Sequence, residues 1–141
     1  MTSTQTSPPA VAAPVRRRGL FVTGLLAATA AAGCATLAGA VAMGAGVDFE
    51  LPDGGESIPL WAFAQLTFIF SMIGLVLAAG LRRWSRHPST QFVRVTVTLT
   101  AVSLVPPFLV DANLATVAAL VLIHLVAAAT FIPVLARRLT A

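Results

Sequence analysis

Three long stretches of the chain carry no charged side chain, and these stretches set the expected architecture. They cover residues 19–47, 57–81 and 112–136. Each is longer than the roughly 20 residues that a helix needs to cross the hydrocarbon of a bilayer. The sequence therefore predicts at least three transmembrane helices.

A fourth stretch, VRVTVTLTAVSLVPPFLVD at residues 93–111, has a pattern that fits two different structures. Polar and apolar residues alternate over its first half, which is typical of a half-buried strand. At 100° per residue, however, Thr96, Thr100, Ser103 and Pro107 fall on one stripe of a helix. Because an isolated strand in lipid would leave its backbone groups unpaired, we interpret this stretch as a membrane helix.

The positions of the charged residues favour a crossing by this fourth stretch. All nine basic residues are arginines, at 16–18, between 82 and 94, and at 137–138. The five acidic residues lie at 48–56 and at 111. If residues 92–110 cross, every arginine lies on or near one side and every acid on the other, as the positive-inside rule prefers. We therefore expect four crossings, with the N and C termini in the cytoplasm.

The predicted fold class is all-α: an integral membrane antiparallel four-helix bundle. The expected helices cover about residues 19–45, 59–82, 90–110 and 113–136. They form a single domain, residues 16–139, with an outer acidic loop at 46–58. Residues 1–15 are rich in Ser, Thr, Pro and Ala and are expected to form a disordered tail.

The third helix carries local signals at both of its ends. Ser89 or Thr90, directly after Pro88, is expected to cap its start. Pro106 and Pro107 remove two backbone donors and should bend or end the helix near residue 105.

Composition supports the membrane class and argues against a nucleic-acid partner. The chain of 141 residues is 57% hydrophobic and 10% charged, whereas about a quarter of the residues of a soluble domain are charged. The isoelectric point near 11.5 would suit nucleic acid, but the basic residues lie in short segments at the ends of apolar stretches. We expect Arg82, Arg83, Arg86 and Arg94 to contact anionic lipid headgroups on the cytoplasmic side instead.

His124 lies at the centre of the last apolar stretch, and an ionisable side chain at that depth is a candidate functional residue. Thr100 and Ser103 lie at similar depth on the preceding helix, and Thr96 and Asn113 extend the candidate polar seam. One interpretation is a proton relay or ligand site. The other is a neutral imidazole that bonds to a hydroxyl on a neighbouring helix, that of Thr100 or Ser103, and helps the helices pack. This interpretation is favoured because no carboxylate lies at that depth.

The first helix has two stripes of small residues that recur every four positions. These are Ala27, Ala31, Ala35 and Gly39, and Gly24, Ala28 and Ala32. Such stripes let helix backbones approach closely. One stripe would serve the bundle and the other a second copy, so a homo-oligomer through this small-residue face is an expected partner.

Cys34, in the sequence AAGC, loosely resembles the residue at which bacterial lipoproteins are lipidated and cleaved. Ala31 stands where such sites usually have Leu, and the apolar run continues to Met43, past the core of a signal peptide. An uncleaved first helix with a buried, inert Cys34 is therefore the preferred interpretation.

The sequence has no arrangement typical of an enzyme, cofactor or metal site. It has no Ser/His/Asp set, no CxxC and no HExxH, and the acids of the outer loop lack EF-hand spacing. We predict no catalytic, cofactor-binding or metal-binding residue. The leading hypothesis is a non-enzymatic accessory or structural membrane protein. The alternative is an oligomeric small-solute transporter or channel along the polar seam, and an enzyme acting on a lipid or quinone comes third.

Three segments resemble a known family: IPLWAFAQLTFIFSMIGLVLAAGLRRWSRHP at 58–88, FVRVTVTLTAVSLVPP at 92–107 and LVLIHLVAAATFIPVLARRL at 120–139. The chain, over about residues 15–139, resembles a family of small four-helix membrane proteins of unknown function from high-GC Gram-positive (actinobacterial) bacteria. The resemblance implies four spans and a plasma-membrane location. It implies no activity, substrate or cofactor.

Overall fold

A computed structural model describes residues 14–50, 57–109 and 112–140, and within these ranges the chain is all-helical. The helices are α1 (Pro14–Gly44), α2 (Leu60–Trp84), α3 (Pro88–Ser103), α4 (Pro106–Leu109) and α5 (Leu114–Thr140). Four stretches of helix, Gly19–Gly44, Leu60–Trp84, Pro88–Leu109 and Leu114–Thr140, are long and apolar enough to cross a membrane. The all-α class and the helical character of the fourth apolar stretch are therefore confirmed.

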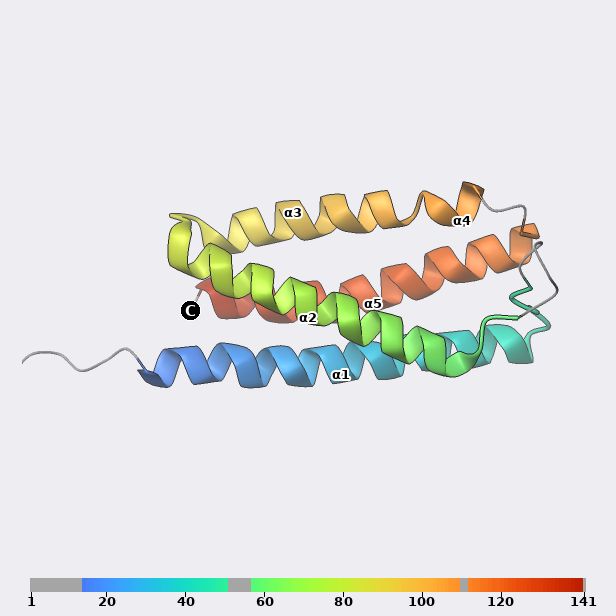
Figure 1. The fold of residues 1–141 in the computed structure, drawn as a ribbon, viewed down its shortest axis with the longest axis horizontal. Helices are drawn as coiled ribbons and strands as arrows, with labels where there is room; N and C mark the ends of the chain where they lie inside the picture. The colour runs from blue at the N-terminus through green and yellow to red at the C-terminus, as the bar shows by residue number, and fades with distance from the viewer. Residues whose placement is uncertain (1–13, 51–56, 110–111, 141) are drawn as a thin grey trace, which may run out of the picture.

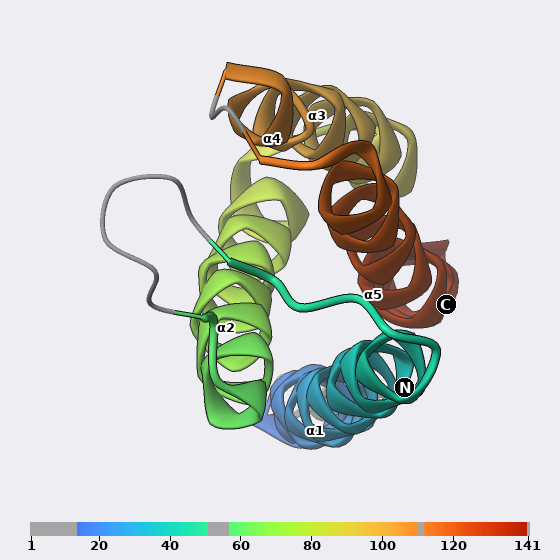
Figure 2. The same cartoon turned by 90° about the vertical axis from the view of Figure 1, so that its right-hand side faces the viewer.

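The helices lie side by side along one axis (Figure 1). The start of α1, the turn between α2 and α3, and the end of α5 lie at one end of the molecule. The connections from α1 to α2 and from α4 to α5 lie at the other end. Viewed along the axis, α1, α2, α3 and α5 follow one another around a ring in which α5 packs again on α1 (Figure 2).

The charged residues of the described segments are separated between these two ends. Arg82 and Arg83 lie in the last turn of α2, and Arg137 and Arg138 lie in the last turn of α5. We call this end of the molecule, which also holds the α2–α3 turn, the arginine end (Figure 1). The described acids, Asp48 and Glu50, follow α1 at the opposite, acidic end.

The start of α3 differs from the prediction. Pro88 is the first helical residue and His87 precedes it as N-cap without a side-chain hydrogen bond, so the expected cap by Ser89 or Thr90 was wrong. Proline suits this position because it lacks the N–H that would have no partner in the first turn. The hydroxyl of Ser89 instead donates to the carbonyl of Ala136, at 3.0 Å, and ties the start of α3 to the end of α5.

Helix α3 ends where Pro106 and Pro107 predicted that it would, near residue 105. The helix stops at Ser103, and the short α4 begins at Pro106. The backbone N–H of Leu104 bonds to the carbonyls of Thr100 and Ala101, which closes the last turn. The expected continuous helix over 90–110 is therefore two helices with a break at residues 104–105.

Two other helix ends lie further out than expected. Helix α1 begins at Pro14, so Pro14 and Val15 are helical although we assigned them to a disordered tail. Residues 1–13, the rest of that tail, lie outside the described residues. Helix α5 continues to Thr140 instead of ending near 136, and it contains Pro133 on an exposed face.

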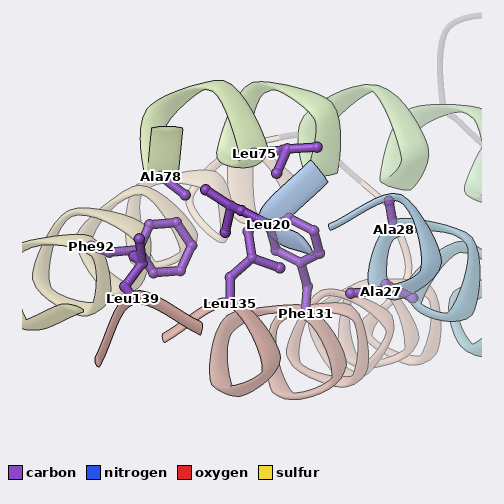
Figure 3. Close-up of a cluster of buried hydrophobic side chains, with 10 residues drawn as sticks. Leu20, Ala27, Ala28, Leu75, Ala78, Phe92, Phe131, Leu135 and Leu139 are labelled. Atoms are coloured by element: carbon purple, nitrogen blue, oxygen red, sulfur yellow. The ribbon is translucent and has the colours of Figure 1, made fainter. Parts of the chain in front are cut away.

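Two apolar cores hold the helices together. The core near the arginine end combines residues of all four long helices, and Phe92 of α3 and Leu135 of α5 are fully buried in it (Figure 3). The core near the acidic end is formed by Ala35, Phe49, Phe63, Ala119 and Ile123. Within both cores, the one buried residue that α3 contributes is Phe92.

Phe49 closes the core at the acidic end from the connection that follows α1. Its φ of 52° lies in the left-handed region, which non-glycine residues seldom adopt. The ring is fully buried and meets the ring of Phe63 edge-on, with centroids 5.1 Å apart. The carbonyl of Phe49 accepts a hydrogen bond from the N–H of Ile58 at 3.2 Å, so both flanks of the connection are held near α2.

The small residues of α1 are buried within this one chain. Both stripes are covered, with Ala28, Ala31 and Ala35 fully inaccessible, because α2 and α5 pack on this helix. The face proposed for a second copy is thus already occupied, and self-association stays a prediction. Cys34 is exposed on the outer side of α1, so the expectation of a buried thiol was wrong.

Candidate functional site

The polar stripe of α3 faces the other helices. Thr96 and Pro107 are buried and Thr100 and Ser103 are half-buried, whereas Val97, Leu99 and Val102 between them are exposed. Beyond Phe92, α3 therefore meets its neighbours through hydroxyl-bearing side chains, and α4 continues the stripe with Pro107. This arrangement positions the candidate seam at the helix interface.

The hydroxyl groups of this stripe bond to their own helix. Thr96 donates to the carbonyl of Phe92 at 2.7 Å, Thr100 to that of Thr96 at 2.8 Å, and Ser103 to that of Thr100 at 2.7 Å. This local bonding satisfies a hydroxyl donor inside an apolar medium without a partner on another helix. The hydroxyl protons are thus engaged, and the oxygens can still accept a hydrogen bond.

His124 also bonds to its own helix. Its Nδ1 lies 2.8 Å from the carbonyl oxygen of Leu120, one turn earlier, and the side chain is half-buried. A carbonyl can only accept, so Nδ1 must carry the proton in this bond. A neutral ring then has Nε2 as an acceptor. The expected bonds from His124 to Thr100 or Ser103 are not formed, because each of these side chains uses a backbone carbonyl instead.

Asn113 lies at the acidic end of α5 and not beside His124. Eleven residues separate the two, which corresponds to about 16 Å along a helix. The side-chain oxygen of Asn113 accepts the backbone N–H of Thr116 at 2.8 Å, as an N-cap does. Its amide nitrogen donates to Asp48 Oδ1 at 3.1 Å. The structure thus assigns Asn113 a capping and linking position and leaves it outside the hydrogen bonds of the seam.

Asp48 is the centre of a small polar cluster that joins the connection after α1 to the start of α5. Its Oδ1 accepts from the backbone N–H of Glu50 at 3.3 Å, from Asn113, and from the buried hydroxyl of Thr116 at 3.3 Å. These hydrogen bonds, that of Glu50 foremost and then that of Asn113, lower the pKa of the Asp48 carboxyl below its ordinary value. We call Asp48, Asn113 and Thr116 the Asp48 clasp.

The Asp48 clasp was not predicted from the sequence. Asp48 was expected among the acids of the outer loop, and Asn113 was expected in the membrane seam. The signal for Asn113 was present, since an Asn directly before a long apolar run is a typical N-cap. Its contact with Asp48, 65 positions away, has no counterpart in a local pattern.

The four arginines predicted to contact headgroups lie in or next to the α2–α3 turn. Arg83, Arg86 and Arg94 are exposed and Arg82 is half-buried. The sequence contains no acidic residue from 57 to 110. The turn is therefore a region of positive charge at the arginine end, far along the chain from any carboxylate.

Metal-ligating side chains do not gather in the described part of the chain, where no three His, Cys, Asp or Glu residues form a group that could hold an ion. Asp53 and Glu56, two of the four acids of the outer loop, lie outside the described residues, as does Asp111.

Comparison with protein families gives a match over most of the chain. The model of a family described as a family of unknown function (DUF6069) matches residues 15–141. No curated protein and no solved structure matches the chain.

Proposed function

This chain belongs to the family of unknown function DUF6069, and from that premise we propose that it is a non-enzymatic multi-pass membrane protein with an accessory or structural role. The observation that carries this proposal is the bonding of its intramembrane polar groups. Thr96, Thr100, Ser103 and His124 each bond to a backbone carbonyl of their own helix. Catalysis or ion relay would instead need polar groups that converge on a shared point.

The outer surface of the helices supports residence in a bilayer. Large apolar side chains point outward on every long helix, such as Leu26 of α1, Phe70 of α2, Val102 of α3 and Leu122 of α5. Soluble monomers rarely expose continuous apolar surface of this kind. Lipid tails would cover these side chains without cost, since they are as apolar as leucine.

We further propose an antiparallel bundle in the plasma membrane of a high-GC Gram-positive bacterium, with both termini and the arginine end in the cytoplasm. The separation of arginines from acids between the two ends supports this orientation. Arg82, Arg83, Arg86 and Arg94 would then lie among anionic headgroups, each contributing about 1 kcal/mol. Self-association would require a face other than the buried small-residue stripes.

The replacement His124→Ala tests the packing role. In that role His124 fills space between helices and satisfies the carbonyl of Leu120 with its Nδ1 proton. The variant in detergent should then unfold at lower temperature than the parent protein and keep the same helical content. An unchanged melting temperature would contradict the packing role. The exposed His87, replaced by Ala, serves as the matched control.

One observation favours the second candidate, a small-solute transporter or channel. His124 is a half-buried ionisable residue in a membrane-spanning helix, and its Nε2 is left as an acceptor. Vesicles reconstituted with the protein provide the distinguishing measurement. Proton or solute flux that His124→Ala abolishes in a folded protein would favour the transporter, whereas absence of flux from the parent protein supports the structural role.

A further inference from the structure

A shallow apolar groove lies at the arginine end, where α2 turns into α3. It has a volume of about 320 Å³. Its floor is formed by Val76, Leu77, Gly80 and Leu81 on successive turns of α2. Trp84 lines it as well, so the groove is apolar over the part that would lie deeper in a membrane.

The indole of Trp84 can lie close to α2 because residue 80 is a glycine. A Cβ at Gly80 would come within 3.3 Å of Trp84 Cζ3, which is closer than ordinary van der Waals contact. Trp84 as a whole residue is 83% exposed. An exposed indole beside a helix end is typical of the membrane interface, where one part of the ring meets hydrocarbon and the N–H meets water.

Ser85, which follows α2, and Gln91, in the first turn of α3, form the polar edge of the groove. Positive charge flanks this edge from both helices. Arg83 is three positions from Gly80, and Arg94 is three positions from Gln91, so each arginine shares a helix face with a groove residue. Both are exposed, and the acids among the described residues, Asp48 and Glu50, lie at the opposite end of the molecule.

We propose that this groove binds one anionic phospholipid, with an acyl chain along the floor of α2 and the phosphate between Arg83 and Arg94. The charge of the flanking residues and the absence of acids select an anionic over a zwitterionic headgroup. Gln91 and Ser85 offer additional hydrogen bonds to the headgroup. The proposal rests on the membrane placement given above, and it goes further, because headgroup contact in general needs no groove and retains no particular lipid.

Fluorescence quenching of Trp84 by brominated lipid tests the proposal directly. The only other tryptophan is Trp61, at the far end of α2, so Trp61→Phe gives a protein with a single reporter beside the groove. This protein is placed in phosphatidylcholine vesicles that contain increasing fractions of dibrominated phosphatidylglycerol or dibrominated phosphatidylcholine. Half-maximal quenching should need a severalfold lower fraction of brominated phosphatidylglycerol.

Two double variants separate the groove from the general basic surface. Arg83→Gln with Arg94→Gln should remove most of this severalfold preference for phosphatidylglycerol. Arg137→Gln with Arg138→Gln removes the same charge from the arginine end, on a helix that contributes no residue to the lining of the groove, and should leave the preference unchanged. Gly80→Leu fills the floor without changing charge and should also weaken the preference, with helical content by circular dichroism as the check of folding.

Three results would count against the proposal. Equal quenching by both brominated lipids in the parent protein would overturn the lipid site and leave the membrane placement intact. An equal loss of preference in both double variants would mean that the whole basic face, and not the groove, attracts the lipid. No quenching by either lipid would contradict the membrane placement itself, and with it the proposed function.

Discussion

At the scale of single residues, glycines decide how closely α1 and α5 approach α2. A Cβ at Gly24 would overlap the side chain of Leu75, and a Cβ at Gly74 would lie 2.8 Å from Phe131 Cε1. Leu75 and Phe131 are themselves buried, so neither can move aside without displacing a further neighbour. The missing side chains are therefore part of the packing between helices.

The substitution Gly24→Ala should destabilise the bundle by about 1–3 kcal/mol, as overpacking of a filled interface does. Thermal unfolding in detergent, followed by circular dichroism, measures the effect. Gly33→Ala is the matched control on the same helix, since a Cβ there meets nothing within 4 Å. If both substitutions lowered the melting temperature equally, helix propensity or detergent contact would be the cause instead of packing against Leu75.

Asp48 makes the stability of the acidic end dependent on pH. Its pKa is lowered in the folded protein because the carboxylate accepts hydrogen bonds from Glu50 and Asn113. A lowered folded pKa means that the contribution is fully present above the ordinary carboxyl value of about 3.9. It is lost as the pH falls through the lowered value.

The test is the melting temperature of the parent protein and of Asp48→Asn, measured between pH 3 and pH 7. At neutral pH the parent should melt at the higher temperature. The difference should shrink below about pH 4, where the carboxyl of the unfolded parent binds protons more readily than that of the folded parent. Glu50→Gln, which replaces an exposed acid with no such hydrogen bonds to its carboxylate, is the control. A difference that is constant over the whole pH range would exclude titration of Asp48 as its origin.

Cys34 and Phe49 illustrate what a sequence cannot provide at this scale. The two stripes of small residues indicated which faces of α1 pack. Small and apolar residues also surround Cys34, so its exposure follows only from the packing of α2 and α5. The left-handed φ of Phe49 likewise follows from the burial of its ring against Phe63. Both are consequences of contacts between distant parts of the chain.

At the scale of elements, α3 is the helix with the least apolar anchoring. Phe92 is its one buried side chain in the apolar cores of the described residues. Its other inward positions carry Thr96, Thr100 and Ser103, whose hydroxyls bond within the helix. Ser89 adds one hydrogen bond to α5 at the arginine end. Phe92 and the hydrogen bond of Ser89 therefore both lie in the first two turns of α3, and the hydroxyl stripe covers the rest of its inward face.

Replacement of Phe92 by Ala should loosen α3 selectively. The cavity left by the ring should cost about 2 kcal/mol, less than in a soluble core, because released apolar groups find lipid tails and not water. Hydrogen exchange in detergent should increase in α3 and change little in α1. Exposed Val97, replaced by Ala, controls for the loss of an apolar side chain. A uniform increase in exchange over all helices would contradict the anchoring role.

The existence of these elements could be predicted because the membrane imposes simple requirements. The long uncharged stretches predicted the apolar helices, and the pair Pro106-Pro107 predicted where α3 stops. The starts of helices were less predictable, since Pro88, Ser89 and Thr90 are all acceptable at a helix start. The contact of Ser89 with Ala136, and not its capping propensity, determines what its hydroxyl does.

At the scale of the whole molecule, the two ends of the four-helix arrangement carry opposite charges. Arginines lie in the last turns of α2 and α5 at one end, and Asp48 and Glu50 follow α1 at the other (Figure 1). This separation was predictable from the sequence, because each helix carries the chain from one end to the other. The number of helices therefore fixes the end at which each charged segment lies. The candidate seam was less predictable. The stripe of α3 faces inward as expected, but Asn113 lies at the acidic end and bonds to Asp48.

The central claim, that four helices cross a membrane with the arginine end in the cytoplasm, is tested most directly by cysteine accessibility in intact cells. With Cys34 replaced by Ala, single cysteines at Ser57 or Ala112 should react with a membrane-impermeant maleimide. Single cysteines at His87 or Thr140 should react only after permeabilisation. Labelling of position 140 in intact cells, or protection of position 112, would contradict the account.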